Sequence, residues 1–291
     1  MKKILVLLFI PLLINACGDT EEKLIAKAKK IHEKAYTVDS HVDTPMWFTR
    51  DGFDYGERHD RDSHRSKLDL PRMIQGGLDG VFFAVFVGQG SRDSVGNARA
   101  MAEANLVIDS INSMLEQYPD EMELAVNSGD LKRISDEGKR AIFLGMENGY
   151  PLGNDLSLID KYYADGVRYI TLVHTRTNDI CDSSNDSLEH NGVTVFGKEV
   201  IAKMNDLGIM IDVSHASDKS FEDIIELSTA PVIASHSCSR AMCDNPRNLT
   251  DEMLLQLKDN GGVIQMCILS DYVKDPGPNP ARDSAKKLVY A

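Results

Sequence analysis

Five residues of the types that bind metal ions follow apolar segments at four separate places in the chain. They are His41, Asp43, Glu147, His215 and His236. A β/α barrel builds its active site from side chains at the C-terminal ends of several strands. Imidazole and carboxylate ligands without a thiolate suit Zn²⁺, with Mn²⁺ and Co²⁺ as substitutes. Because a bound metal ion lowers the pKa of water from ~15.7 towards ~7, this set of residues predicts a metal-dependent hydrolase.

The order of the five residues suits two metal ions. His41 and Asp43 are two residues apart, so in a β-strand their side chains point to the same face and can hold one ion. The carboxylate of Glu147 has two oxygens and can bridge both ions. His215 and His236, from neighbouring strands, can hold the second ion. Each residue alone is more often structural, but together they predict a dinuclear site with two Zn²⁺ per chain.

Apolar strand-like segments alternate with helical segments along the chain. We expect seven strands, over 35–43, 77–87, 140–147, 166–174, 208–215, 230–236 and 261–269. We expect helices between them, over 97–118, 157–166, 196–208, 220–228 and 250–262, several of which end in Gly. Strands that are continuously apolar are typical of a parallel sheet buried on both faces. The alternation predicts a TIM-like (β/α)8 barrel of the metal-dependent hydrolase type.

Two features bear on this fold assignment. A doubly wound open sheet has the same alternation, but no Gly-rich phosphate motif follows the first strand. The spacing of the strands places an eighth strand near or beyond residue ~295. We therefore expect the last β/α unit to be missing from this chain of 291 residues, which would be incomplete at its C-terminus.

The N-terminus has the features of a bacterial export signal. Two lysines precede a short apolar run, and residues 14–17 resemble the lipoprotein cleavage box. The sequence predicts a signal peptide over 1–16, lipidation of Cys17, a tether over 17–24 and the barrel over 25–291. We expect the protein in the bacterial cell envelope, lipid-anchored to the membrane and facing the periplasm or the cell surface. Secretion with a free Cys17 is the alternative.

The charge limits the partners of the chain. The formal net charge is −13 and is spread along the sequence without a basic block. This argues against nucleic acid and against anionic lipid headgroups as partners. Whether the chain forms a homodimer is left open.

We do not expect the cysteines or the loop histidines to bind a metal ion. A disulfide between Cys181 and either Cys238 or Cys243 is left open, and buried thiols are the default. The polar segment 50–67 is predicted to be a long loop at the rim of the barrel, in which His59 and His64 are solvated.

The motifs together resemble the membrane (renal-type) dipeptidases, the M19 metallopeptidases. The matching stretches are DSHVDTP, GMENG, GVRYITLVHTRTND, IDVSHAS and ASHSCSRAMCDNPRNL, and the resemblance runs from about residue 34 to the end. It implies hydrolysis of the peptide bond of dipeptides by a hydroxide that bridges two zinc ions. The family tends to accept a D-residue on the carboxyl side of the dipeptide.

The resemblance also implies roles for individual residues. His41 and Asp43 match the ligands of one zinc ion, Glu147 matches the bridge, and His215 and His236 match the ligands of the other ion.

Three further residues match positions that contact the substrate. His174 matches the histidine that contacts the substrate carbonyl and stabilises the tetrahedral intermediate. Arg247 matches the arginine that binds the free carboxylate of the dipeptide, and Tyr272 is expected to assist it. Arg240 and Arg176 are the competing candidates for the carboxylate.

The chain departs from the family pattern at its C-terminal end. The family carries an aspartate for proton transfer on the eighth strand, in a GSDFDG-like stretch that this sequence lacks. Asp271 and Asp283 do not follow an apolar strand in that context. We therefore expect either a fragment of a longer protein or an impaired variant.

Two other functions are compatible with the residues. One is a different amidohydrolase-type barrel, such as a deaminase or a cyclic-amide hydrolase. Those sites usually begin with HxH and often use a bridging lysine, whereas this chain has HxD and Glu147. The other is a catalytically impaired envelope lipoprotein that binds a metal ion or a peptide.

Overall fold

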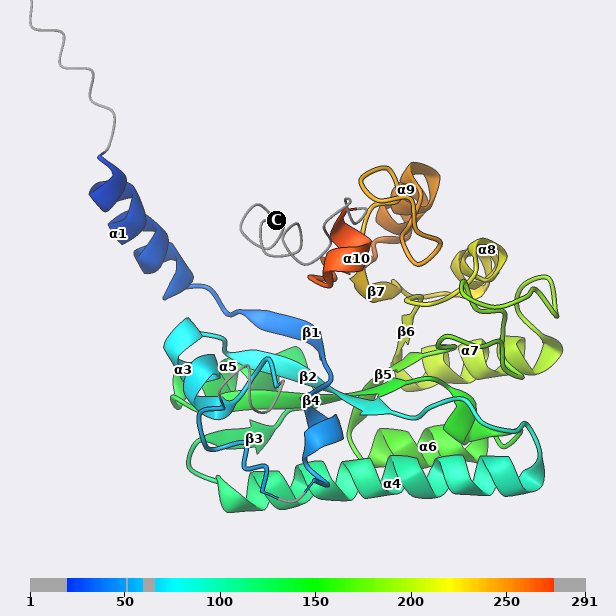
Figure 1. Cartoon of the computed structure of the whole chain (residues 1–291), viewed down its shortest axis with the longest axis horizontal. Helices are drawn as coiled ribbons and strands as arrows, with labels where there is room; N and C mark the ends of the chain where they lie inside the picture. The colour runs from blue at the N-terminus through cyan, green and yellow to red at the C-terminus, as the bar shows by residue number, and fades with distance from the viewer. Residues whose placement is uncertain (1–19, 51, 60–65, 275–291) are drawn as a thin grey trace, which may run out of the picture. The chain divides into compact units, whose positions relative to one another are not determined.

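The computed structural model describes residues 20–50, 52–59 and 66–274 (Figure 1), and the chain divides into two units, the first ending at Ala35 and the second beginning at Tyr36. The predicted signal peptide and Cys17 lie outside the described residues. The first unit contains helix α1 (Glu21–His32), whose residues are all exposed. The helix starts inside the segment predicted as a tether. Acidic residues in its first turn and basic residues in its last turn stabilise it through the helix dipole. None of the helices among the described residues is long and apolar enough to cross a membrane.

The second unit is built on a parallel sheet. Its strands are β1 (Val38–Val42), β2 (Gly80–Phe86), β3 (Met122–Leu124), β4 (Arg140–Glu147), β5 (Val167–Thr171), β6 (Met210–Asp212), β7 (Ile233–Ser237) and β8 (Val263–Met266). Neighbouring strands pair in the order β1-β2-β4-β5-β6-β7-β8, which Figure 1 shows from blue to orange, and β3 pairs with β4 off this path. These strands include all seven that the sequence predicted.

Side chains link the two ends of the strand path. The backbone N–H of Ser40 in β1 donates to Oε1 of Gln265 in β8 at 2.9 Å. The hydroxyl of Ser40 donates to the carbonyl oxygen of Ser235 in β7 at 2.5 Å. The sheet is therefore a nearly closed barrel, and the TIM-like fold is confirmed. Strand β3 was missed because Glu121 and Glu123 interrupt its apolar residues, so the segment has no continuous apolar run. The eighth strand expected beyond residue 291 stays a prediction.

Helices connect the strands, as the alternation predicted. They are η1 (Thr44–Trp47), α3 (Leu70–Gly76), α4 (Ser94–Gln117), α5 (Ser128–Asp136), η2 (Tyr150–Leu152), α6 (Ser157–Ala164), α7 (Val195–Leu207), α8 (Asp218–Leu227), α9 (Asp251–Asn260) and α10 (Ser270–Val273). Gly208 and Gly261 end α7 and α9 in the left-handed conformation, with φ of 75° and 80°. The chain can therefore turn directly into the next strand.

Neighbouring strands of the sheet contribute to a small cluster of buried side chains. Phe82 and Phe143 stack with ring centroids 4.6 Å apart, and Tyr169 lies 5.3 Å from Phe82. The cluster contains side chains of β2, β4 and β5 together with Ala125 and Ile134, and partly buried side chains of β1, β6 and β7 pack against it. Contributions from six neighbouring strands identify it as the barrel interior. Gly145 leaves the space that the ring of Tyr169 occupies, because a Cβ atom at Gly145 would overlap that ring.

The loop after β1 differs from the prediction at His59. The side chain is 6% exposed rather than solvated. Its ring stacks on Phe53 with centroids 4.3 Å apart, and its Nε2 lies 2.5 Å from the carbonyl oxygen of Asp54. The polar composition of the loop concealed this local packing. His64 lies outside the described residues.

The four described cysteines are free thiols. Cys181, Cys238 and Cys243 are buried, and Cys267 is partly exposed. Buried thiols were the default expectation, and the alternative of a disulfide at Cys181 does not occur.

We expect Gly145→Ala to lower the free energy of unfolding by about 1–3 kcal/mol, because the new methyl group overpacks the interior against Tyr169. Urea denaturation of the metal-free protein measures it. The matched control is Gly76→Ala at the end of α3, where a Cβ atom meets nothing within 4 Å. Equal stability of the two variants would contradict the close approach at Gly145.

Candidate metal centre

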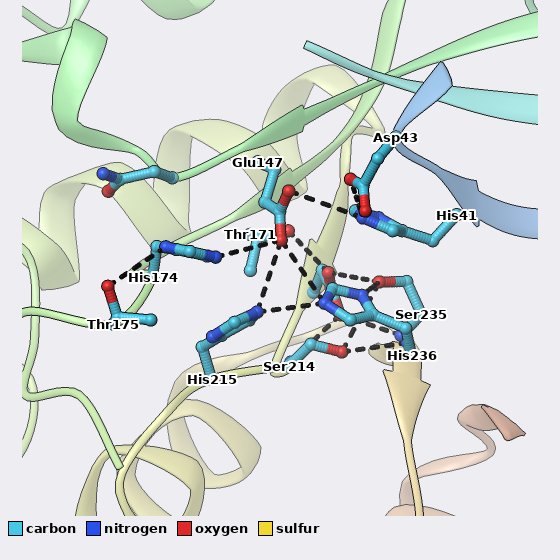
Figure 2. Close-up of polar contacts among 12 residues, drawn as sticks. His41, Asp43, Glu147, Thr171, His174, Thr175, Ser214, His215, Ser235 and His236 are labelled. Atoms are coloured by element: carbon cyan, nitrogen blue, oxygen red, sulfur yellow. Dashed lines mark hydrogen bonds and ion pairs between the residues drawn. The ribbon is translucent and has the colours of Figure 1, made fainter. Parts of the chain in front are cut away.

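Four histidine side chains converge on the carboxylate of Glu147 (Figure 2). The Nε2 atoms of His174, His215 and His236 lie 3.4, 3.3 and 3.4 Å from its Oε1. The Nε2 atom of His41 lies 3.4 Å from its Oε2. Glu147 is only 4% exposed. It therefore interacts with these rings rather than with bulk water.

Three barrel strands and the turns that follow two others position these side chains. His41 lies in β1, Glu147 is the last residue of β4, and His236 lies in β7. His174 and His215 each follow the end of a strand by three residues, after β5 and β6. Because the strands are parallel, their C-terminal ends meet at one edge of the barrel.

The backbone on either side of the centre is strained. His215 has φ of 72°, and Asn148, directly after Glu147, has φ of 80°. A residue other than glycine in this region costs about 1–3 kcal/mol, so the surrounding fold must hold it there. At Asn148, the side-chain amide donates to the carbonyl oxygen of Val87 at 3.0 Å. At His215, the carbonyl oxygen accepts the N–H of Ser184 at 2.8 Å.

Asp43 lies beside His41, but not through the strand geometry that the sequence predicted. Strand β1 ends at Val42, and Asp43 has φ of −80° and ψ of 8°, outside the β region. The argument from alternating strand positions therefore does not apply to Asp43. Its Oδ1 nevertheless lies 3.2 Å from Nε2 of His41, and its side chain is 61% exposed.

The centre is electrostatically suited to a cation. Burial opposes the charge on Glu147, but the positive charge of His41 and hydrogen bonds from two further histidines hold the pKa of Glu147 well below its usual range. Burial also opposes charge on His41, but Tyr169 and Glu147 outweigh it and raise the pKa of His41 well above its usual range. Burial lowers the pKa of His236 to about 4 and lowers that of His215 as well. The centre therefore combines one ionised carboxylate with mostly neutral imidazoles, and this combination favours the binding of a cation.

These donors fit a metal ion. The Nε2 atoms of His215 and His236 face each other at 3.0 Å. Two lone pairs this close need a proton or a cation between them. Nitrogen and carboxylate oxygen without thiolate are the donors that Zn²⁺ accepts.

The ligand atoms form two sets of three, each within 4.8 Å. They are His41, Glu147 and His236, and Glu147, His174 and His215. Glu147 belongs to both sets, in keeping with the bridging position predicted for it. The sets combine the histidines differently from the predicted pairs. Which residue binds which ion stays a prediction.

The sequence analysis missed the residues behind the histidines. The hydroxyl of Tyr169 lies 2.8 Å from Nδ1 of His41, and the hydroxyl of Ser235 lies 2.7 Å from Nδ1 of His236. Ser235 also donates to Oδ2 of Asp212 at 2.6 Å. A signal was present, because Asp212 is an acidic residue at the end of a buried apolar strand.

Arg247 lies buried beside the centre, 2% exposed. Its Nη1 donates to Oγ of Ser237 and its Nη2 to the carbonyl oxygen of His236, both at 2.9 Å. Its Nε is buried without a hydrogen-bond partner among the described residues, and no described carboxylate forms an ion pair with it. The ring of Tyr272 lies 5.6 Å from its Cζ. Burial lowers the pKa of Arg247.

The two competing arginines differ from Arg247. The guanidinium of Arg240 donates to both carboxylate oxygens of Asp218 at 2.7 Å, so its charge is already matched. Arg176 is exposed. Of the three, Arg247 therefore has the strongest need for an anionic ligand.

The model of the membrane dipeptidase family, peptidase family M19, matches residues 25–291. The chain belongs to this family. A dipeptidase of Schizosaccharomyces pombe, itself uncharacterized, is 30% identical over 93% of the chain and 69% of its own length. Dipeptidase tcpJ of Claviceps purpurea is 34% identical over 69% of the chain and 49% of its own length. The chain thus spans about half to two thirds of the length of these two relatives.

Solved structures share the barrel. The crystal structure of the probable dipeptidase PvdM from Pseudomonas aeruginosa has a TM-score of 0.81 and 33% identity, covering 89% of this chain and 66% of that one. A metallo peptidase from Rhodobacter sphaeroides, liganded with a phosphinate mimic of the dipeptide L-Ala-D-Ala, has a TM-score of 0.72 at 22% identity, covering 88% and 82%. At that identity the second likeness concerns the fold alone.

We expect Tyr169→Phe to weaken zinc binding about tenfold, because His41 loses the hydroxyl that orients its ring. Competition with a chelating indicator measures it. Tyr162→Phe is the matched control, since the Tyr162 hydroxyl is equally buried but has no hydrogen-bond partner among the described residues. Equal zinc affinities for the two variants would contradict a role for Tyr169 in orienting His41.

Proposed function

We propose that the protein is a zinc-dependent dipeptidase with two zinc ions per chain. The observation that carries the proposal is the convergence of four imidazoles on the buried carboxylate of Glu147. Membership of the membrane dipeptidase family supports the same conclusion. So does the buried guanidinium of Arg247, which suits the free carboxylate of a dipeptide.

We propose that His41 and Asp43 hold one zinc ion, His215 and His236 hold the other, and Glu147 bridges them. When bound, zinc lowers the pKa of water towards ~7 and so makes hydroxide available at neutral pH. The residues of the chain hold this site rigid, because Glu147 ends a buried strand and His236 lies within one.

His174 is proposed to face the substrate. Its side chain is 19% exposed, compared with 6% for both His41 and His215. An imidazole N–H at the accessible side of the centre can donate to the oxygen of the scissile carbonyl as negative charge develops on it. Its edge contact with the ring of Phe86, with centroids 4.8 Å apart, limits its rotation.

The decisive experiment is a dipeptide hydrolysis assay on the natural protein that contains this sequence. We expect release of alanine from L-Ala-D-Ala, loss of turnover on chelation and recovery with Zn²⁺. Glu147→Gln should lose at least about a hundredfold in kcat/KM, because the neutral amide offers one oxygen in place of two. Glu123→Gln is the control, since Glu123 forms an exposed ion pair with Arg133.

Other outcomes would overturn the proposal. Full activity of Glu147→Gln would exclude the bridging role. Faster turnover of a cyclic amide than of any dipeptide would favour another amidohydrolase-type activity. Two bound zinc ions with peptide affinity but no turnover would identify a binding protein.

Arg247 is proposed to bind the carboxylate of the dipeptide, with Tyr272 beside it. Hydrogen bonds to a charged group contribute about 1.5–3 kcal/mol, so Arg247→Lys should reduce kcat/KM for a free dipeptide about 10- to 100-fold. The same variant should lose much less against the dipeptide amide, which has no carboxylate. Equal losses for both substrates would show structural damage instead.

We also propose that the protein is exported to the bacterial envelope and anchored through lipid on Cys17. The export signal and the cleavage box in residues 1–17 support this.

A further inference from the structure

A chain of hydrogen bonds lies behind His236, on the side away from Glu147 (Figure 2). The Nδ1 atom of His236 lies 2.7 Å from Oγ of Ser235. That hydroxyl donates to Oδ2 of Asp212 at 2.6 Å. Asp212 is fully buried and Ser235 is 3% exposed, so bulk water does not compete for these contacts.

The number of protons available determines which group donates in each of these hydrogen bonds. Oδ1 of Asp212 accepts the backbone N–H groups of Ser214 and Ser235 at 3.0 and 2.9 Å. Oδ2 accepts the hydroxyls of Thr171 and Ser235, both at 2.6 Å. A carboxylate only accepts, and a serine hydroxyl has one proton to donate. Because Ser235 donates its proton to Asp212, it can only accept from the ring of His236.

We propose that Asp212, acting through Ser235, holds His236 in the tautomer that carries its proton on Nδ1. Nε2 then carries no proton and is directed at the metal centre, 3.4 Å from Oε1 of Glu147. Asp212 and Ser235 are positioning residues. The importance of this tautomer for metal binding rests on the proposed zinc site, because a metal ion binds the unprotonated nitrogen.

His236 differs in this respect from two other histidines of the centre, His41 and His215. Nδ1 of His215 is buried without a partner among the described residues. Nδ1 of His41 meets the hydroxyl of Tyr169, which can donate or accept. Of these three rings, only that of His236 has its tautomer fixed by a chain that ends on a carboxylate.

The test is Asp212→Asn. The two backbone N–H groups that face Oδ1 select the carbonyl oxygen of the new amide, so its NH₂ group must face the two hydroxyls. The amide then donates to Ser235, and Ser235 must turn its own proton towards Nδ1 of His236. We expect His236 to change to the tautomer with its proton on Nε2 and zinc affinity to fall about 10- to 100-fold.

Two measurements are needed on metal-free protein at neutral pH. ¹⁵N spectra of protein labelled at histidine report which nitrogen of His236 carries the proton, and a chelator competition gives the zinc affinity. Thr171→Val is the matched control, because it removes a hydroxyl from the same oxygen of Asp212 without touching Ser235. Ser235→Thr keeps the hydroxyl. Both should retain the Nδ1 proton and stay within about threefold of wild-type zinc affinity.

The proposal is overturned if Asp212→Asn keeps the Nδ1 proton, or if its zinc affinity matches that of Thr171→Val. If the variant does not fold, the wild-type spectrum decides alone, because a proton on Nε2 of His236 would exclude the proposal. A wild-type protein that does not hydrolyse dipeptides would overturn the proposed function, but it would leave the tautomer measurement unaffected.

Discussion

The buried carboxylate of Glu147 is the constraint on which the site depends. An ionised group removed from water is costly unless positive charge or hydrogen-bond donors surround it. Four imidazoles surround this one, and only a proton or a metal ion among them balances the charge. The barrel edge holds the four rings around the carboxylate, since each ring lies on a strand or on the turn that follows one.

The interior of the barrel and the metal centre are mechanically connected. The ring of Tyr169 packs in the interior because Gly145 leaves room for it, and its hydroxyl reaches Nδ1 of His41. Asp212 and Ser235 hold His236 in the same way. The histidines are thus oriented from the buried core. Metal ligands need such support, because a histidine ring that can rotate binds a metal ion less tightly.

Strand positions and ligand types could be predicted, whereas local geometry could not. All seven predicted strands are present in the sheet. They could be predicted because continuous apolar segments are typical of buried parallel strands. Asp43 was predicted as part of β1, but the chain leaves the strand at Val42. His59 was predicted to be solvated and is buried against Phe53. Both differences arise in the loop after β1, where composition carries little information about packing.

The sequence by itself determined which side chains gather at the centre. In a β/α barrel the C-terminal ends of the strands meet at one edge, so residues such as Glu147 and His236 meet although 89 positions separate them. Only the tertiary structure decided which ring atoms face one another, which way the hydroxyl of Ser235 donates, and that Arg247 has no carboxylate partner among the described residues. The physical reason is that hydrogen bonding and charge pairing depend on separations of about 3 Å between atoms from different strands, and no pattern along one strand encodes them.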